Sequence, residues 1–102
     1  MSDAAHLVVL YNAPKDPAAF EQYYAQTHLP LLAKHAKEIG FTNGLLVKFD
    51  AGMPYYRKAE LTFASADAMK KGTSTPGFKA VADDIPRFAS GGFTVLTGVE
   101  TK

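Results

Sequence analysis

The order of structural elements can be read outward from residues 6–32, which have the sequence HLVVLYNAPKDPAAFEQYYAQTHLPLL. Residues 6–11 are rich in β-branched and aromatic side chains and end at an Asn-Ala-Pro loop, a pattern typical of a strand. Asp16 can cap a helix because its carboxylate accepts hydrogen bonds from free N–H groups, and Pro17 fits the first helical position. This stretch therefore predicts a strand, a short loop and a helix.

Pro30 interrupts the predicted helix. A proline cannot donate to the carbonyl four residues back, and it disfavours helical dihedral angles at the preceding Leu29. We therefore expect a kink or a break at His28-Leu29. The pattern then resumes as a helix over residues 30–39, with Gly40 as its C-terminal cap. The region is predicted to be one bent helix or two short ones.

The rest of the chain completes a βαββαβ order. Residues 41–50 and 55–64 predict two strands of a hairpin. Ser65 and Thr75-Pro76 each begin a further helical piece, Pro86 bends the second one, and residues 93–100 predict the last strand. In 102 residues this order predicts a single domain spanning residues 1–102 with a ferredoxin-like α+β fold, in which helices cover one face of a four-stranded antiparallel sheet.

The predicted strands carry apolar side chains on both faces, because successive side chains of a strand point to opposite sides. Helices on one side would leave the second apolar face open to water, and in a chain this short a second copy is the available cover. We therefore expect a two-fold homodimer packed sheet to sheet. The alternating residues are Leu7 and Val9 against Val8 and Leu10 in the first strand, and Phe93 and Val95 against Leu96 in the last.

Composition excludes several classes of function. The chain has no cysteine, so disulfides, thiolate nucleophiles and sulfur-ligated metals are absent. The net charge is +1, with basic and acidic residues dispersed, and no glycine motif for phosphate occurs, so we expect no nucleic-acid partner and no nucleotide cofactor. No apolar run is long enough for a membrane-spanning helix, and the start MSDAAH lacks a secretory signal, so we expect no membrane partner and a cytoplasmic location.

His28 is the first candidate for chemistry. At a helix kink its ring would lie near the negative end of the helix dipole, which favours the imidazolium form, and flanking aromatic residues would provide a partly dry wall. Proton transfer near neutral pH is then plausible. The alternative is that His28 caps carbonyls freed by Pro30, and spacing alone does not separate the two interpretations. Tyr24 lies four residues before His28 on the same face, where it could orient a substrate oxygen or only pack in the core.

Four further residues are candidates for substrate binding. Tyr23, Tyr11 and Phe20 are aromatic residues expected near the same pocket, each with a packing role as the alternative. Arg57 falls on the apolar face of its strand, where a guanidinium requires an anion from the protein or a ligand unless it reaches water along its stem. We expect no metal, because two of the three histidines, seven residues apart on the helix, are too far from each other for one ion.

Two groups of residues carry a family resemblance. They are Pro14, Asp16-Pro17, Phe20, Tyr23-Tyr24 and His28-Leu29-Pro30-Leu31 in the first half, and ADDIPRF at residues 82–88. Over nearly the whole chain, this pattern resembles the EthD family of the dimeric α+β-barrel superfamily. The resemblance implies a dimeric α+β barrel and a bacterial protein linked to ethyl tert-butyl ether degradation, where the family's namesake is needed by a cytochrome P450 system. It also implies that His28 and Tyr24 occupy a position suited to proton transfer.

Two functions follow from the residues and the resemblance together. The first is catabolic: a small apolar or aromatic compound binds between helix and sheet, and His28 transfers a proton in an isomerase, decarboxylase or dehydratase reaction without a cofactor. The second is a non-catalytic dimeric accessory or metabolite-binding module that supports an oxygenase partner. A dimer with no pocket is the structural alternative to both. The haem-degrading members of the superfamily use a tryptophan, which this chain lacks.

Overall fold

The computed structural model describes residues 3–101, and its centre is a four-stranded antiparallel sheet. The strands lie in the order β2-β3-β1-β4, so that β3 and β1 are central and β2 and β4 are the edges. Their bounds are Ala5–Tyr11 for β1, Asn43–Lys48 for β2, Arg57–Phe63 for β3 and Phe93–Val99 for β4. In this register Val9 of β1 lies between Ala59 of β3 and Val95 of β4.

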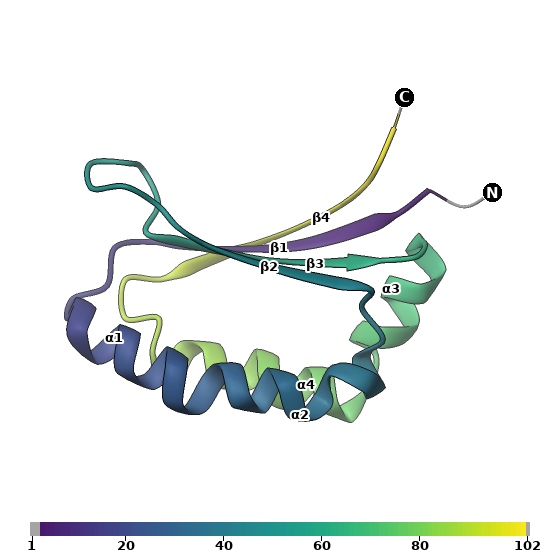
Figure 1. The fold of residues 1–102 in the computed structure, drawn as a ribbon, viewed down its shortest axis with the longest axis horizontal. Helices are drawn as coiled ribbons and strands as arrows, with labels where there is room; N and C mark the ends of the chain where they lie inside the picture. Colours follow the sequence, from purple (N-terminus) through teal and green to yellow (C-terminus); the bar gives the residue numbers. More distant parts are fainter. Residues whose placement is uncertain (1–2, 102) are drawn as a thin grey trace.

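The helices lie on one side of the sheet, with α3 at one end (Figure 1). The first helical region is α1 (Pro17–Tyr23), a π-helical turn η1 (Tyr24–His28) and α2 (Leu29–Ile39). The second is α3 (Ala66–Thr73), α4 (Pro76–Asp84) and a 3₁₀ turn η2 (Ile85–Arg87). The predicted βαββαβ order and the ferredoxin-like α+β fold are thus confirmed.

Side-chain caps fix where the helices begin. Asp16 accepts a hydrogen bond from the N–H of Ala19 at 3.2 Å, and Ser65 and Thr75 cap α3 and α4 in the same way. Gly40 ends α2 in the left-handed conformation, at φ 81°, which a glycine adopts without steric cost. These caps were all predicted from the sequence. The hairpin strands are shorter than predicted, and Tyr56 lies in the connecting loop.

The predicted break at His28-Leu29 is wrong, because the chain stays helical there and the irregularity is a π turn over Tyr24–His28. Leu29 keeps helical dihedral angles, φ −64° and ψ −40°, and its N–H donates to the carbonyl of Tyr24, five residues back. In an α-helix the ring of a proline clashes with the carbonyl four residues before it. The π turn is wider than an α-turn, so it changes which backbone carbonyls lie close to the Pro30 ring. The helical path therefore continues through the proline, and the local change is the π turn that precedes it.

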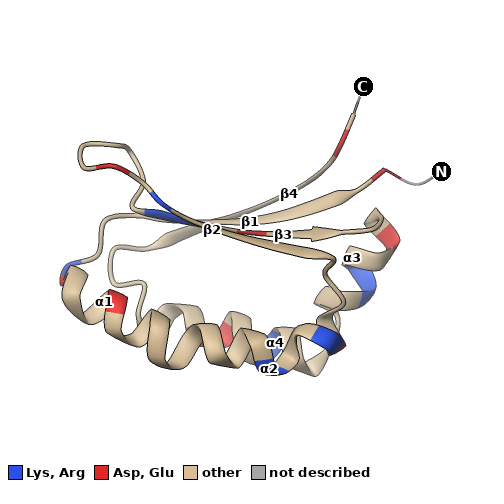
Figure 2. Cartoon of the chain, in the orientation of Figure 1, with Lys and Arg blue, Asp and Glu red and all other residues tan. Residues whose placement is uncertain are grey.

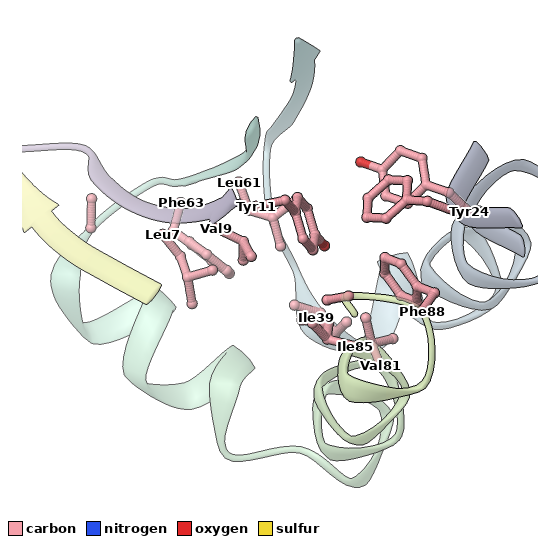
Figure 3. Packing of buried hydrophobic residues seen from close by; sticks show 13 residues of the cluster. Leu7, Val9, Tyr11, Tyr24, Ile39, Leu61, Phe63, Val81, Ile85 and Phe88 are labelled. Atoms are coloured by element: carbon pink, nitrogen blue, oxygen red, sulfur yellow. The ribbon is translucent and has the colours of Figure 1, made fainter. Parts of the chain in front are cut away.

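The core lies between the sheet and the helical layer (Figure 3). Leu7 and Val9 of β1 face Val81 and Ile85 of the helical layer, and all four are at most 6% exposed. Edge strand β4 is different, because its residues are exposed along its whole length. Figure 2 shows the charged residues scattered over helices, strands and loops.

Candidate functional site

His28 and Asp84 form a buried pair between the two helical regions. His28 is the last residue of the π turn and Asp84 is the last residue of α4, and their side chains are 5% and 3% exposed. His28 Nδ1 lies 2.9 Å from Asp84 Oδ2, and the Tyr23 hydroxyl donates to Asp84 Oδ1 at 2.7 Å. A weaker contact at 3.5 Å comes from Arg87. The His28 ring therefore has a fixed partner on one nitrogen.

Burial and hydrogen bonding set the protonation of this pair. Burial lowers the pKa of His28 below its ordinary value, although the adjacent Asp84 carboxylate acts in the opposite direction. Burial alone would raise the pKa of Asp84, but hydrogen bonds from Tyr23 and His28 outweigh this and lower it. At neutral pH the pair is a neutral imidazole beside a carboxylate. Because Nδ1 faces the carboxylate it carries the ring proton, and Nε2 retains a lone pair.

A cavity of about 250 Å³ lies between the sheet and the helices, and His28 lines it. Aliphatic and aromatic residues of β1, β3, α4 and β4 form nearly all of its wall. Only His28 and Tyr11 bring polar side-chain atoms to the described lining. Phe93 and Val95 form its open side, since they are 37% and 49% exposed on the edge strand. The site is thus an apolar chamber with one imidazole and one phenol in its wall.

Tyr24 supports the imidazole through its ring. The rings of Tyr24 and His28 stack with centroids 5.8 Å apart and an interplanar angle of 15°, and Phe88 approaches His28 at 4.5 Å. Arg57 lies over the Tyr24 ring at 5.0 Å, a cation–π distance. Its guanidinium donates to both carboxylate oxygens of Glu21, at 2.6 and 3.0 Å. The His28 ring therefore has Asp84 at its edge and aromatic rings at its faces.

The structure places the predicted site residues in two groups. His28 and Tyr11 line the cavity, and Figure 3 shows Tyr11 extending from β1 toward the helical layer. Tyr23, Tyr24 and Phe20 pack behind the cavity around Phe88. The Tyr24 hydroxyl is buried and has no hydrogen-bond partner within residues 3–101, and Tyr24 is not among the residues that line the cavity, so its substrate-orienting role stays a prediction.

The structure bears on two alternatives and one expectation about side-chain environment. Arg57 has a protein anion as its partner, because it pairs with the Glu21 carboxylate, and its side chain is 17% exposed. His28 makes its hydrogen bond to Asp84 and caps no helix with its side chain. Its pKa is lowered rather than raised, because loss of hydration outweighs the effects that favour imidazolium.

Asp84 and Glu21 were not predicted as part of the site. Both are acidic residues on helices, and nothing in the local sequence distinguishes them from exposed neighbours such as Asp83. The segment ADDIPRF was noted only as part of the family pattern, although it contains Asp84 and Phe88, which contact His28. Its proline-bent turn was the one local signal that could have directed attention to Asp84.

Within residues 3–101, no group of three or more histidine, aspartate or glutamate side chains is arranged to hold a metal ion. In the same range, no helix is both long and apolar enough to cross a membrane.

The βαββαβ order, with its helices on one face of the sheet, defines a ferredoxin-like α+β protein. The chain belongs to the EthD domain family, whose model matches residues 12–92. It is 34% identical over 91 residues to an uncharacterised 11.0 kDa protein of the thcB-thcC intergenic region of Rhodococcus erythropolis, an alignment that covers 88% of each chain.

Solved structures share the fold. An EthD family protein from Bacillus halodurans superposes with a TM-score of 0.84 at 24% identity, covering 96% of this chain and 99% of that one. SnoaB, a cofactor-independent oxygenase from Streptomyces nogalater, superposes with a TM-score of 0.65 at 21% identity, covering 99% of this chain and 94% of that one. These identities are low, so the two similarities are evidence of fold alone.

Proposed function

We propose that this EthD-family protein binds a small apolar or aromatic compound in the cavity and that His28 accepts a proton from it. The observation that carries the proposal is the His28–Asp84 pair at the cavity wall, with Nδ1 bound to the carboxylate at 2.9 Å. Nε2 is then the nitrogen available to a bound compound, and its lone pair can act as a general base. Asp84 orients the ring and stabilises the imidazolium that forms.

The apolar wall favours this chemistry in two ways. It binds a compound by removing apolar surface from water, and it keeps bulk water from the base. In the proton-transfer step, a C–H or O–H bond of the substrate breaks, its electron pair stays on the substrate, and the proton moves to His28 Nε2. Return of that proton to another atom of the same molecule completes an isomerisation, and its return to a leaving hydroxyl completes a dehydration. Neither step needs a cofactor.

The test is deuterium exchange into small cyclic ketones that carry aromatic or aliphatic rings, followed by NMR in heavy water. Wild-type protein should accelerate exchange at the carbon beside the carbonyl, and His28→Gln should reduce this acceleration by at least about a hundredfold, within the range of general-base catalysis. His35→Gln is the matched control, because His35 lies on α2 outside the cavity lining. Equal exchange in the wild type and His28→Gln would show that His28 is not the base.

We also propose that the protein is a homodimer formed through its sheet. Support comes from the side of the sheet opposite the helices, where Leu96 is 49% exposed and pairs with the half-buried Val8, and where Leu45 on the other edge strand is 47% exposed. Covering these apolar side chains would stabilise an assembly of two copies. Light scattering at micromolar concentration should return about twice the mass of one chain, and the mass of a single chain would contradict the proposal. The link to ether degradation and to an oxygenase partner stays a prediction from the family resemblance.

A further inference from the structure

The cavity wall contains no cationic group in its described lining. The two polar side chains there are His28, whose ring is a neutral imidazole, and Tyr11, whose hydroxyl is un-ionised because burial raises its pKa. The nearby cation Arg57 is turned to Glu21, with contacts of 2.6 and 3.0 Å to its carboxylate oxygens. Its charge is therefore paired outside the chamber.

The charge that does lie close to the chamber is negative. Asp84 is 2.9 Å from the His28 ring and only 3% exposed, so little water screens its carboxylate. Two groups face it besides His28: the Tyr23 hydroxyl at 2.7 Å and Arg87 at 3.5 Å. The Arg87 side chain is 71% exposed, so solvent weakens the compensation that it provides.

We infer that the site selects substrates that are neutral when they bind, and that it rejects carboxylates, sulfates and phosphates. This inference rests on the proposed function of the cavity and defines its substrate class. An anion entering the chamber would lose its hydration without gaining a cationic partner, and it would also meet the field of Asp84. A neutral compound with an O–H or activated C–H acid avoids both costs. Once its proton has moved to His28, the anion formed lies beside an imidazolium.

The charges around the cavity favour reactions that begin from a neutral molecule over reactions that begin from an anion. Decarboxylation and the isomerisation of carboxylated lactones both begin from a carboxylate, which the chamber disfavours. Enolisation of a ketone, ionisation of a phenol, and dehydration through an enolate begin from neutral molecules and need only a base and a hydrogen-bond donor. His28 can provide the base, and Tyr11 can donate from its un-ionised hydroxyl to the oxygen on which negative charge develops. Tyr11 is thus the residue that recognises a phenol or carbonyl oxygen.

The cavity size fits this class of compound. An apolar cavity of about 150 Å³ in another protein already binds benzene, so a chamber of about 250 Å³ has room for a bicyclic aromatic compound. The sharpest comparison uses compounds of one shape that differ in charge. Naphthalene, 2-naphthol and 2-naphthoate form such a set, with no polar group, a neutral O–H acid and a carboxylate respectively.

The experiment measures dissociation constants of the three compounds by calorimetry at about pH 7. We expect 2-naphthol to bind at least about tenfold more tightly than 2-naphthoate, because burial of an unpaired charge costs more than the corresponding 1.4 kcal/mol. Lowering the pH toward about 4, where the naphthoate takes up a proton, should strengthen its binding. Equal or tighter binding of the naphthoate at about pH 7 would overturn the inference while leaving the cavity as a binding site. Binding of none of the three compounds would overturn the proposed function itself.

Variants test the origin of the selectivity. Asp84→Asn removes the negative charge behind His28, so the ratio of the naphthoate to the naphthol dissociation constant should fall severalfold. Asp83→Asn is the matched control, because Asp83 is the adjacent residue on α4 but pairs with Lys79 at the surface and lies outside the cavity lining. It should leave the ratio unchanged. If both variants leave the ratio as in the wild type, Asp84 is not the source of the discrimination, and that part of the inference is wrong.

Discussion

Glu21→Gln tests the ion pair behind the Tyr24 ring. Glu21 accepts two hydrogen bonds from Arg57 and one from the Tyr56 hydroxyl at 2.8 Å, and these contacts lower its pKa from 4.5 to about 2. A shift of that size corresponds to about 3 kcal/mol at most. The Glu21 side chain is 32% exposed, so solvent screening reduces the figure to about 1–2 kcal/mol. Glutamine keeps the size of the side chain but loses the charge.

The sign of the pH dependence follows from the lowered pKa. The unfolded chain binds a proton at Glu21 near pH 4.5 and the folded chain only near pH 2, so the stabilisation is complete above pH 4.5 and is lost as the pH falls toward 2. Urea unfolding should therefore find Glu21→Gln less stable by about 1–2 kcal/mol at pH 7, with a difference that shrinks as the pH is lowered below 4.5. A difference that stays constant between pH 7 and pH 3 would refute the ionic origin of this contribution.

Two further substitutions test the packing. Gly72→Ala should destabilise the protein by about 3 kcal/mol in urea unfolding, because a Cβ at Gly72 would overlap the backbone carbonyl of Ile39, whereas Gly98→Ala, with open space around it, should change stability by less than about 0.5 kcal/mol. Tyr24→Phe should leave stability unchanged or raise it by about 1 kcal/mol, since it removes a buried hydroxyl without a partner within residues 3–101. A loss above about 1 kcal/mol in the same assay would show that this hydroxyl has a partner, such as a buried water.

Much of the fold was predictable because its signals are local. The order of strands and helices depends on residues close together in the chain. The same holds for the helix caps, which are Asp16, Ser65 and Thr75 at the N-termini of α1, α3 and α4, and Gly40 at the C-terminus of α2. The outcome at Pro30 was not predictable in the same way. A proline favours a break when only its own backbone is considered. Packing of the helix against the sheet and α4 favours a continuous helical path. The π turn accommodates the proline and keeps the path helical.

The candidate site was predictable only in part, because its partners are distant in sequence. His28 could be identified from its position, but its hydrogen-bond partner Asp84 lies 56 residues away and Arg57 finds Glu21 across 36 residues. Spacing within one helix cannot predict either contact. The sequence also suggested the imidazolium form of His28. A helix dipole can be inferred from sequence, whereas the degree of burial of the ring cannot.

The π turn connects the fold to the site. A helix in which Tyr24 and His28 are four residues apart places them on one face, and the wider turn brings their rings to a nearly parallel stack at 5.8 Å while Nδ1 reaches Asp84 at 2.9 Å. Single π turns are rare in helices and frequent at functional sites. Here the residues that bound the turn are His28, the proposed base, and Tyr24, whose ring stacks on it. The π turn before Pro30 and the position of the proposed base are therefore parts of one structural feature.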